Sequence, residues 1–233
     1  MNNRDCGASP VIIMKHNSEY YNCLDEKLRR FFGAPKKYCE CPTSALVRGV
    51  LSQNTTDRNR DKAFERLRNR FPDWHSVLDA DDSEIVEAIR IAGMANQRAV
   101  RIKNLLRWLA KNNKGKIDAR FILKFPPQEA MDKLTSINGI GMKTASVFLL
   151  FCGNMPFFPV DTHIKRIMIR LNIFPPNTSA DKMIIALSKA IPAKLHYSLH
   201  LNLIELGRTI CTARKILCEK CPIKRFCKTG EGL

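Results

Sequence analysis

The segment from Leu134 to Ala145 combines a flexible turn with a lysine at the start of a helix. It runs Leu-Thr-Ser-Ile-Asn-Gly139-Ile140-Gly141-Met-Lys143-Thr144-Ala. Two glycines one residue apart permit positive φ and remove side-chain bulk. The backbone amides of such a turn, at a helix N-terminus, form an anion site, for which a DNA phosphate is the natural ligand. An ordinary tight turn is the alternative for a lone Gly-x-Gly.

Lys143 is the first candidate for covalent chemistry, because it stands just inside the second of these helices. The positive end of a helix disfavours a cation and so favours the neutral amine. A neutral, partly buried lysine is a nucleophile, whereas a surface lysine would bind phosphate. This segment alone leaves both roles open.

Asp161 follows Lys143 by 18 residues, in the run Val160-Asp161-Thr162-His163. Its simplest role is to cap the N-terminus of the next helix. A carboxylate held between a helix N-terminus and a reactive lysine would also stay ionised, stabilise positive charge on a sugar ring and accept a proton. We expect His163 to be structural.

Four of the nine cysteines are clustered in the last 23 residues of the chain. They are Cys211, Cys218, Cys221 and Cys227. In a cytosolic chain, clustered thiols indicate metal binding or catalysis rather than disulfides. Four thiolates suit either tetrahedral zinc or a [4Fe–4S] cluster, so chemistry alone leaves the metal open. We expect the others to pack as small apolar side chains. These are Cys6, Cys23, Cys39, Cys41 and Cys152.

The elements that position these residues are predicted to be helices. Apolar residues recur at three- and four-residue steps, as at Tyr21, Leu24, Leu28 and Phe31. Asp57 is expected to cap a helix, and further helices are expected over roughly 142–152, 161–171, 179–191 and 194–209. No convincing pair of alternating strands is present. The sequence therefore predicts an all-α fold of about ten short helices.

Length and charge narrow the classes of function. A chain of 233 residues with 45% apolar residues fits one large domain or two small ones with a buried core. No window approaches the ~18 apolar residues of a membrane helix, and no signal-peptide core is present. We therefore expect a soluble, intracellular protein, cytoplasmic and nucleoid-associated if the source is a prokaryote. A net charge of +17 predicts a polyanionic partner, above all nucleic acid.

Taken together, Gly-Ile-Gly-x-Lys-Thr-Ala and the later Val-Asp-Thr-His resemble the endonuclease III family of helix–hairpin–helix (HhH-GPD) DNA glycosylases. The resemblance covers roughly residues 18–228 and includes the spacing of the four cysteines. It implies that Lys143 is the nucleophile and that Asp161 is its electrostatic and proton-transfer partner. It also implies that the four cysteines hold a [4Fe–4S] cluster.

The activity implied by this resemblance is that of a bifunctional DNA glycosylase and AP lyase. Such an enzyme would remove damaged, in particular oxidised, pyrimidines through a lysine Schiff base and β-elimination. Its partner would be double-stranded DNA with a damaged base or an abasic site, bound by a monomer away from any membrane. The alternatives are a mismatch-specific uracil or thymine glycosylase, a non-catalytic DNA-binding module and, more remotely, an electron-transfer protein.

The resemblance further implies two helical lobes with a DNA-binding cleft between them. Residues 42–155 would form a six-helix domain that ends with the hairpin. Residues 18–41 and 156–233 would form a discontinuous [4Fe–4S] domain, and residues 1–17 a flexible arm.

A glycosylase must also extrude its target nucleotide and fill the gap. In the implied wedge loops, either Gln53 or Asn54 would insert, and Met94 matches a leucine that intercalates. We expect further DNA contacts from the hairpin and from the loop between the first two clustered cysteines. These are Gly139, Ile140, Gly141, Thr144, Arg214 and Lys215, with Lys224 and Arg225 as further candidates.

Overall fold

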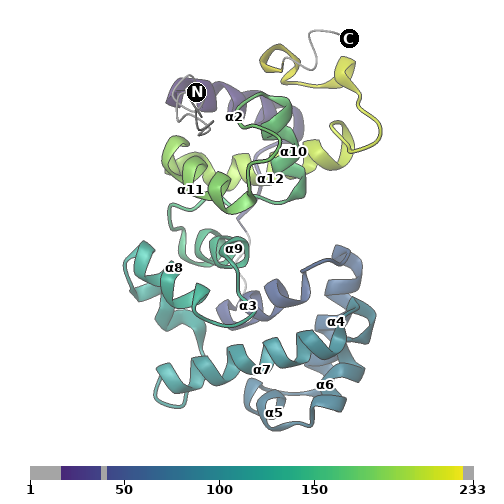
Figure 1. The fold of residues 1–233 in the computed structure, drawn as a ribbon, viewed down its shortest axis with the longest axis vertical. Helices are drawn as coiled ribbons and strands as arrows, with labels where there is room; N and C mark the ends of the chain where they lie inside the picture. Colours follow the sequence, from purple (N-terminus) through teal and green to yellow (C-terminus); the bar gives the residue numbers. More distant parts are fainter. Residues whose placement is uncertain (1–16, 38–40, 228–233) are drawn as a thin grey trace, which may run out of the picture. The chain divides into compact units, whose positions relative to one another are not determined.

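Helices dominate the computed structural model, which describes residues 17–37 and 41–227 (Figure 1). Within these ranges the sole β pairing is an isolated antiparallel bridge between Cys211 and Ile216. The all-α prediction is therefore confirmed. The expected flexible arm lies almost entirely outside the described residues, as does Cys39. None of the described helices is both long and apolar enough to cross a membrane.

The chain folds as two units. The central unit comprises residues 38–155, and the terminal unit combines residues 1–37 with residues 156–233. In its described part the central unit contains seven α-helices and two short 3-10 helices. They are α3 (Pro42–Leu51), α4 (Asp57–Arg70), α5 (Trp74–Asp79), α6 (Asp82–Ile89), η1 (Arg90–Ala92), α7 (Ala95–Asn112), η2 (Ala119–Lys124), α8 (Pro127–Thr135) and α9 (Met142–Gly153).

The core of the central unit is built around α7, the longest helix of the described chain. This helix buries Ala99, Ile102, Leu106 and Leu109 and packs against α3, α5 and α6. Helix α3 also packs against α9, so closely that a Cβ on Gly49 would lie 2.9 Å from the Thr144 Cγ2 atom. The two helices of the hairpin, α8 and α9, pack against each other.

Two local expectations for the central unit were wrong. Thr56, not Asp57, caps α4: the Thr56 side chain accepts a hydrogen bond from the Asn59 amide, and Asp57 is the first helical residue. Six helices were expected, but α5 adds a seventh. This helix spans only six residues and is held by a capping box in which the Asp73 and Ser76 side chains each bond the other's backbone amide.

The terminal unit joins the first described helix to the C-terminal part of the chain. Its elements are α2 (Ser18–Phe32), α10 (Thr162–Arg170), α11 (Ala180–Ala190), η3 (Ala193–Leu195), α12 (His196–Thr209), η4 (Cys218–Lys220) and η5 (Lys224–Phe226). Helix α12 lies in the middle of this unit and packs against both α2 and α10. Tyr21, Leu24 and Leu28 are buried in α2, but Phe31 is 53% exposed, so the apolar face ends one turn earlier than expected.

Candidate functional site

The hairpin turn of the central unit connects α8 to α9 through a backbone that needs glycine. The turn is closed by hydrogen bonds from the Ile137 amide to the Leu134 carbonyl and from the Ile140 amide to the Ile137 carbonyl. Gly139 has φ +97°, and a Cβ there would lie 2.5 Å from the Arg101 Cγ atom. The buried side chain of Ile140 anchors the tip of the turn.

Gly141 is the N-cap of α9 and has no side chain to bond the first amides of that helix. The first amides of a helix lack intrahelical partners. A phosphate oxygen can therefore approach them at the positive end of the helix dipole. This uncapped N-terminus belongs to the helix that carries Lys143.

Lys143 is the second residue of α9, and its side chain is exposed. The partial burial expected for a nucleophilic lysine is not observed at this position. The exposed position leaves the amine accessible to a substrate. Thr144, the next residue, is half-buried against α3 and takes part in helix packing.

Asp161 caps α10 in the terminal unit. Its Oδ1 atom accepts a hydrogen bond of 2.8 Å from the Ile164 amide. The segment before it is fixed on both sides, because the Phe158 amide donates to the Ser188 Oγ atom and the Pro159 carbonyl lies 3.0 Å from the His200 Nδ1 atom. The carboxylate is therefore held at a defined position at the N-terminus of α10.

Arginines of α10 connect this cap to the cysteine cluster. The Arg166 guanidinium donates to the carbonyls of Gly207 (2.7 Å) and Cys211 (3.0 Å) at the end of α12. Arg170 donates to the Thr212 carbonyl and, at 3.0 Å, to the Cys211 Sγ atom. His163 lies 3.1 Å from Arg166 and packs against Gly207, where a Cβ would be 2.6 Å from the His163 Cβ atom.

The four clustered cysteines line a single small cavity, together with Arg170, Ile210, Ile216 and Lys224. Burial, together with the neighbouring thiols, raises the pKa of Cys221 to about 11 and also raises that of Cys218. Thiols gathered in this way ionise readily only when a metal neutralises the thiolates. The donor set therefore fits a four-thiolate metal group. Among the described residues, no three or more His, Cys, Asp or Glu side chains lie in an arrangement that could hold a metal ion directly.

A turn between the first two of these cysteines exposes two basic side chains. The Lys215 amide donates to the Thr212 Oγ1 atom, which closes the turn. Arg214 and Lys215 project from it and are exposed. Arg225 is also exposed, whereas Lys224 is half-buried at the cysteine cavity.

The structure separates Gln53 from Asn54. The Gln53 Nε2 atom donates to the Gly139 carbonyl at 3.0 Å, and its Oε1 atom accepts a bond of 2.5 Å from Arg101. Gln53 is therefore tied to the hairpin turn. Asn54 is exposed and has a left-handed backbone with φ +52°, and Met94 is 47% exposed with φ +49°.

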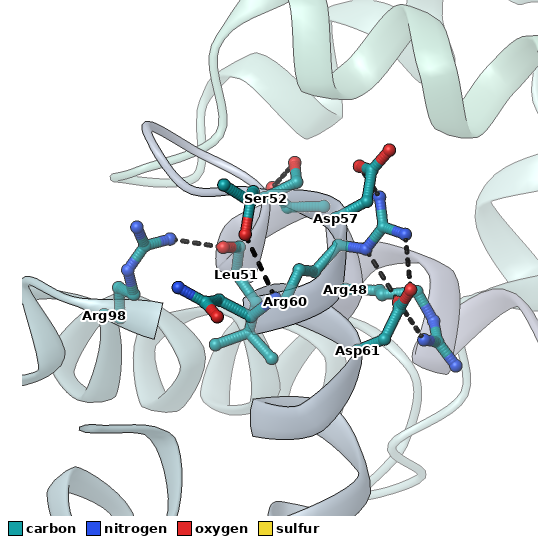
Figure 2. A network of polar contacts seen from close by, with 10 residues as sticks. Arg48, Leu51, Ser52, Asp57, Arg60, Asp61 and Arg98 are labelled. Carbon is teal, nitrogen blue, oxygen red and sulfur yellow. Dashed lines mark hydrogen bonds and ion pairs between the residues drawn. The ribbon is translucent and has the colours of Figure 1, made fainter. Parts of the chain in front are cut away.

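The segment that carries Gln53 and Asn54 connects α3 to α4, and an ion-pair network joins these helices (Figure 2). Arg48 on α3 pairs with Asp61 on α4 at 2.8 Å. Arg60 pairs with Asp57 and Asp61, and its hydrogen bond is the largest cause of a lowered Asp61 pKa. Both ends of this loop are therefore fixed.

Comparison with known proteins places the chain in a family. The sequence model of the HhH-GPD superfamily of base excision DNA repair proteins matches residues 47–193. Endonuclease III of Sulfolobus acidocaldarius is 34% identical over 189 residues, which cover 79% of this chain and 81% of the relative. A putative DNA glycosylase of Arabidopsis thaliana is 35% identical over 176 residues, which cover 76% of this chain but only 60% of the relative's length.

A solved structure agrees with this placement. A trapped covalent intermediate between endonuclease III and DNA has a TM-score of 0.77 and 27% identity, over 92% of this chain and 96% of that one. The chain belongs to the endonuclease III family of the HhH-GPD superfamily of base excision DNA repair proteins. It is therefore a DNA glycosylase of base excision repair, and DNA is its partner.

Sequence reasoning missed three arginines that organise the site, Arg98, Arg166 and Arg170. The spacing of Arg98 does indicate burial, because this residue stands four positions before Ile102 on the apolar face of α7. A cation on such a face is buried only when hydrogen bonds satisfy it. No local pattern distinguishes Arg166 and Arg170 from other basic residues, since their partners lie more than 40 residues away.

Proposed function

We propose that this chain is a bifunctional DNA glycosylase and AP lyase that removes oxidised pyrimidines from double-stranded DNA through a Schiff base at Lys143, acting as a monomer. The observation that carries the proposal is the accessible Lys143 in the first turn of α9, directly after a Gly-x-Gly turn with no side-chain cap. A phosphate bound by the turn would bring the DNA backbone to the lysine.

In the proposed reaction the Lys143 amine attacks C1′ of an extruded nucleotide. The new C–N bond forms, the bond from C1′ to the base breaks, and the departing base takes up a proton. Asp161, held at the N-terminus of α10, stabilises the positive charge on the sugar and accepts the proton that the amine loses. The C1′–O4′ bond of the sugar then breaks, O4′ takes up a proton, and the C1′–N bond becomes the Schiff base. Loss of a 2′ proton from this Schiff base breaks the C3′–O bond, and the 3′ phosphate leaves with the electron pair of that bond.

We further propose that the four cysteines hold a [4Fe–4S] cluster, because they line one cavity and four thiolates are the ligand set of such a cluster. When bound, the cluster would tie the C-terminal segment together. Arg170 would hold Cys211 in place, and the turn with Arg214 and Lys215 would contact the DNA backbone. The contacts of Gln53 support Asn54, rather than Gln53, as the residue that inserts beside Met94.

The decisive experiment is borohydride trapping on a duplex that contains thymine glycol. The wild type and Lys143→Gln are compared with Lys111→Gln, which removes an exposed lysine at the end of α7. We expect a covalent complex with the wild type and with Lys111→Gln but none with Lys143→Gln, because only an amine forms the reducible imine.

Other results would redirect the assignment. A complex on an abasic site but not on thymine glycol would retain the lyase and favour a mismatch-specific uracil or thymine glycosylase. A complex that persists in Lys143→Gln would exclude Lys143 as the nucleophile. Salt-dependent DNA binding without any complex would favour a non-catalytic DNA-binding module.

A further inference from the structure

Arg98 is a fully hydrogen-bonded cation in the core of the central unit. Its side chain lies on α7 and the residue is 2% exposed. A guanidinium has five N–H donors in a rigid fork. All five have backbone carbonyl acceptors here: Nε bonds Gly93 (2.6 Å), NH1 bonds Val50 (3.0 Å) and Leu51 (2.5 Å), and NH2 bonds Ala92 (3.2 Å) and Gln53.

The five acceptors belong to two segments far apart in the sequence. Val50 and Leu51 end α3 and Gln53 lies in the loop that follows, whereas Ala92 ends η1 and Gly93 lies in the turn before α7. Figure 2 shows Arg98 reaching the Leu51 carbonyl from α7. One side chain therefore joins the loop at 51–54 to the loop at 92–94.

Each of the two loops contains an exposed residue with a left-handed backbone. Asn54 follows Gln53, and Met94 follows Gly93. This backbone is uncommon for residues other than glycine, although asparagine adopts it more readily than methionine does. The carbonyls that Arg98 binds directly precede both residues, so the same guanidinium restrains both tips.

The charge of Arg98 is not explained by an ion pair. Among the described residues no carboxylate bonds it, and burial together with nearby Arg101 lowers its pKa. Lys103, the other buried cation of α7, differs because it pairs with Asp82 at 2.7 Å and bonds the Ala80 carbonyl. Simple filling of the core would need neither a charge nor five donors.

We propose that Arg98 is a positioning residue, a brace that fixes the Asn54 and Met94 loops relative to each other so that both tips enter a DNA duplex together. The proposal rests on the proposed function, in which these tips fill the gap left by an extruded nucleotide. Because Arg98 is buried, it contributes through the loops and not through a phosphate contact.

The test compares Arg98→Met and Arg98→Lys with Lys103→Met, which removes a buried cation from the same helix but away from the loops. Affinities are measured for an undamaged duplex and for one carrying a tetrahydrofuran abasic analogue opposite 2-aminopurine. The fluorescence of the 2-aminopurine reports its unstacking. In the wild type, unstacking should raise the 2-aminopurine fluorescence when the abasic duplex is bound. In Arg98→Met we expect the ratio of the affinities for the abasic and undamaged duplexes to fall about tenfold. The rise in fluorescence should be lost in the same variant.

Two further readouts separate positioning from other roles. The dependence of affinity on salt should stay unchanged in Arg98→Met, because no phosphate contact is removed. Lys103→Met should keep the wild-type preference even if it melts earlier. Arg98→Lys has only three donors and should give an intermediate preference.

Hydrogen exchange keeps the proposal testable if Arg98→Met does not fold. In Arg98→Lys the amides of residues 52–56 and 93–96 should exchange faster together, while those of Lys103→Met stay as in the wild type. An Arg98→Met variant with the wild-type preference, or an Arg98→Lys variant with unchanged exchange in both loops, would overturn the brace. If the wild type showed no preference for the abasic duplex, that result would count against the proposed function. The hydrogen-exchange experiment would still test whether Arg98 restrains the two loops.

Discussion

At the scale of single residues, the site depends on groups whose structural and chemical roles coincide. Asp161 is both a helix cap and the proposed partner of the nucleophile. Cys211 is held by Arg170 through its sulfur and by Arg166 through its carbonyl. Substitutions that keep one role and remove the other can therefore separate stability from chemistry.

Asp161→Asn should separate the two roles of that residue. Asparagine caps a helix about as well as aspartate, so we expect a thermal midpoint near that of the wild type. It has no charge to stabilise the sugar, so single-turnover base release should fall by about 100-fold or more. Asp161→Ala should lose the same activity and in addition about 0.5–2 kcal/mol of stability, measured by urea unfolding. Wild-type base release by Asp161→Asn would contradict the proposed role.

Arg170→Gln should weaken the binding of the proposed iron–sulfur cluster by the four cysteines. The guanidinium donates a hydrogen bond of 3.0 Å to the Cys211 sulfur and so helps to hold this proposed ligand in place. Loss of such a supporting contact typically lowers metal affinity by about 10–100-fold. Iron and visible absorbance per chain after chelator challenge give the measurement. Arg225→Gln, which changes an exposed arginine between the third and fourth cysteines, is the control and should retain its iron.

At the scale of elements, the hairpin shows which local features a sequence can predict. The glycine pair and the lysine indicated a turn followed by a helix N-terminus, and α8 and α9 flank such a turn. The capping residue of α4 was misassigned because Thr56 and Asp57 are both good caps and adjacent. Helix α5 was missed because six residues are too few for a periodic pattern.

The two hairpin glycines should respond differently to the same change. Gly139→Ala puts a Cβ 2.5 Å from Arg101 at a positive φ, so we expect a loss of about 1–3 kcal/mol of stability. Gly141→Ala meets no atom within 4 Å and should melt like the wild type. Its methyl group stands beside the amides that would bind phosphate, so its DNA affinity should fall. Thermal unfolding and DNA titration of both variants test this; equal melting points would refute the packing argument.

At the scale of the whole molecule, charge was predictable from composition, but the connections that organise the site were not. The excess of basic residues correctly indicated a nucleic-acid partner. By contrast, Arg98 donates to backbone carbonyls of residues up to 48 positions away. Every residue has a backbone carbonyl, so the sequence does not indicate which ones will accept these hydrogen bonds. The same holds for Arg166 and Arg170. Roles that depend on the folded chain therefore had to come from the structure.

DNA affinity should fall steeply with salt, as expected for a chain with a net charge of +17. If Arg214 and Lys215 each contact a phosphate, replacing either by glutamine should reduce the slope of log affinity against log salt by about 0.9. Titrations of an undamaged duplex over a series of salt concentrations provide the measurement. The control Glu219→Gln changes an exposed acidic residue of the same C-terminal segment and should not flatten the slope. Unchanged slopes in Arg214→Gln and Lys215→Gln would exclude those contacts.

The terminal unit is assembled from both sides of the central unit in the sequence, which sets an order for folding on the ribosome. Helix α2 buries Tyr21, Leu24 and Leu28 in a unit where it packs against α12, yet about 160 residues separate the two helices. At about 5–20 residues per second, α2 waits for roughly 8–30 s before α12 is made. The central unit is complete in the nascent chain well before then. During this interval the apolar side chains of α2 lack the helix that covers them in the folded protein.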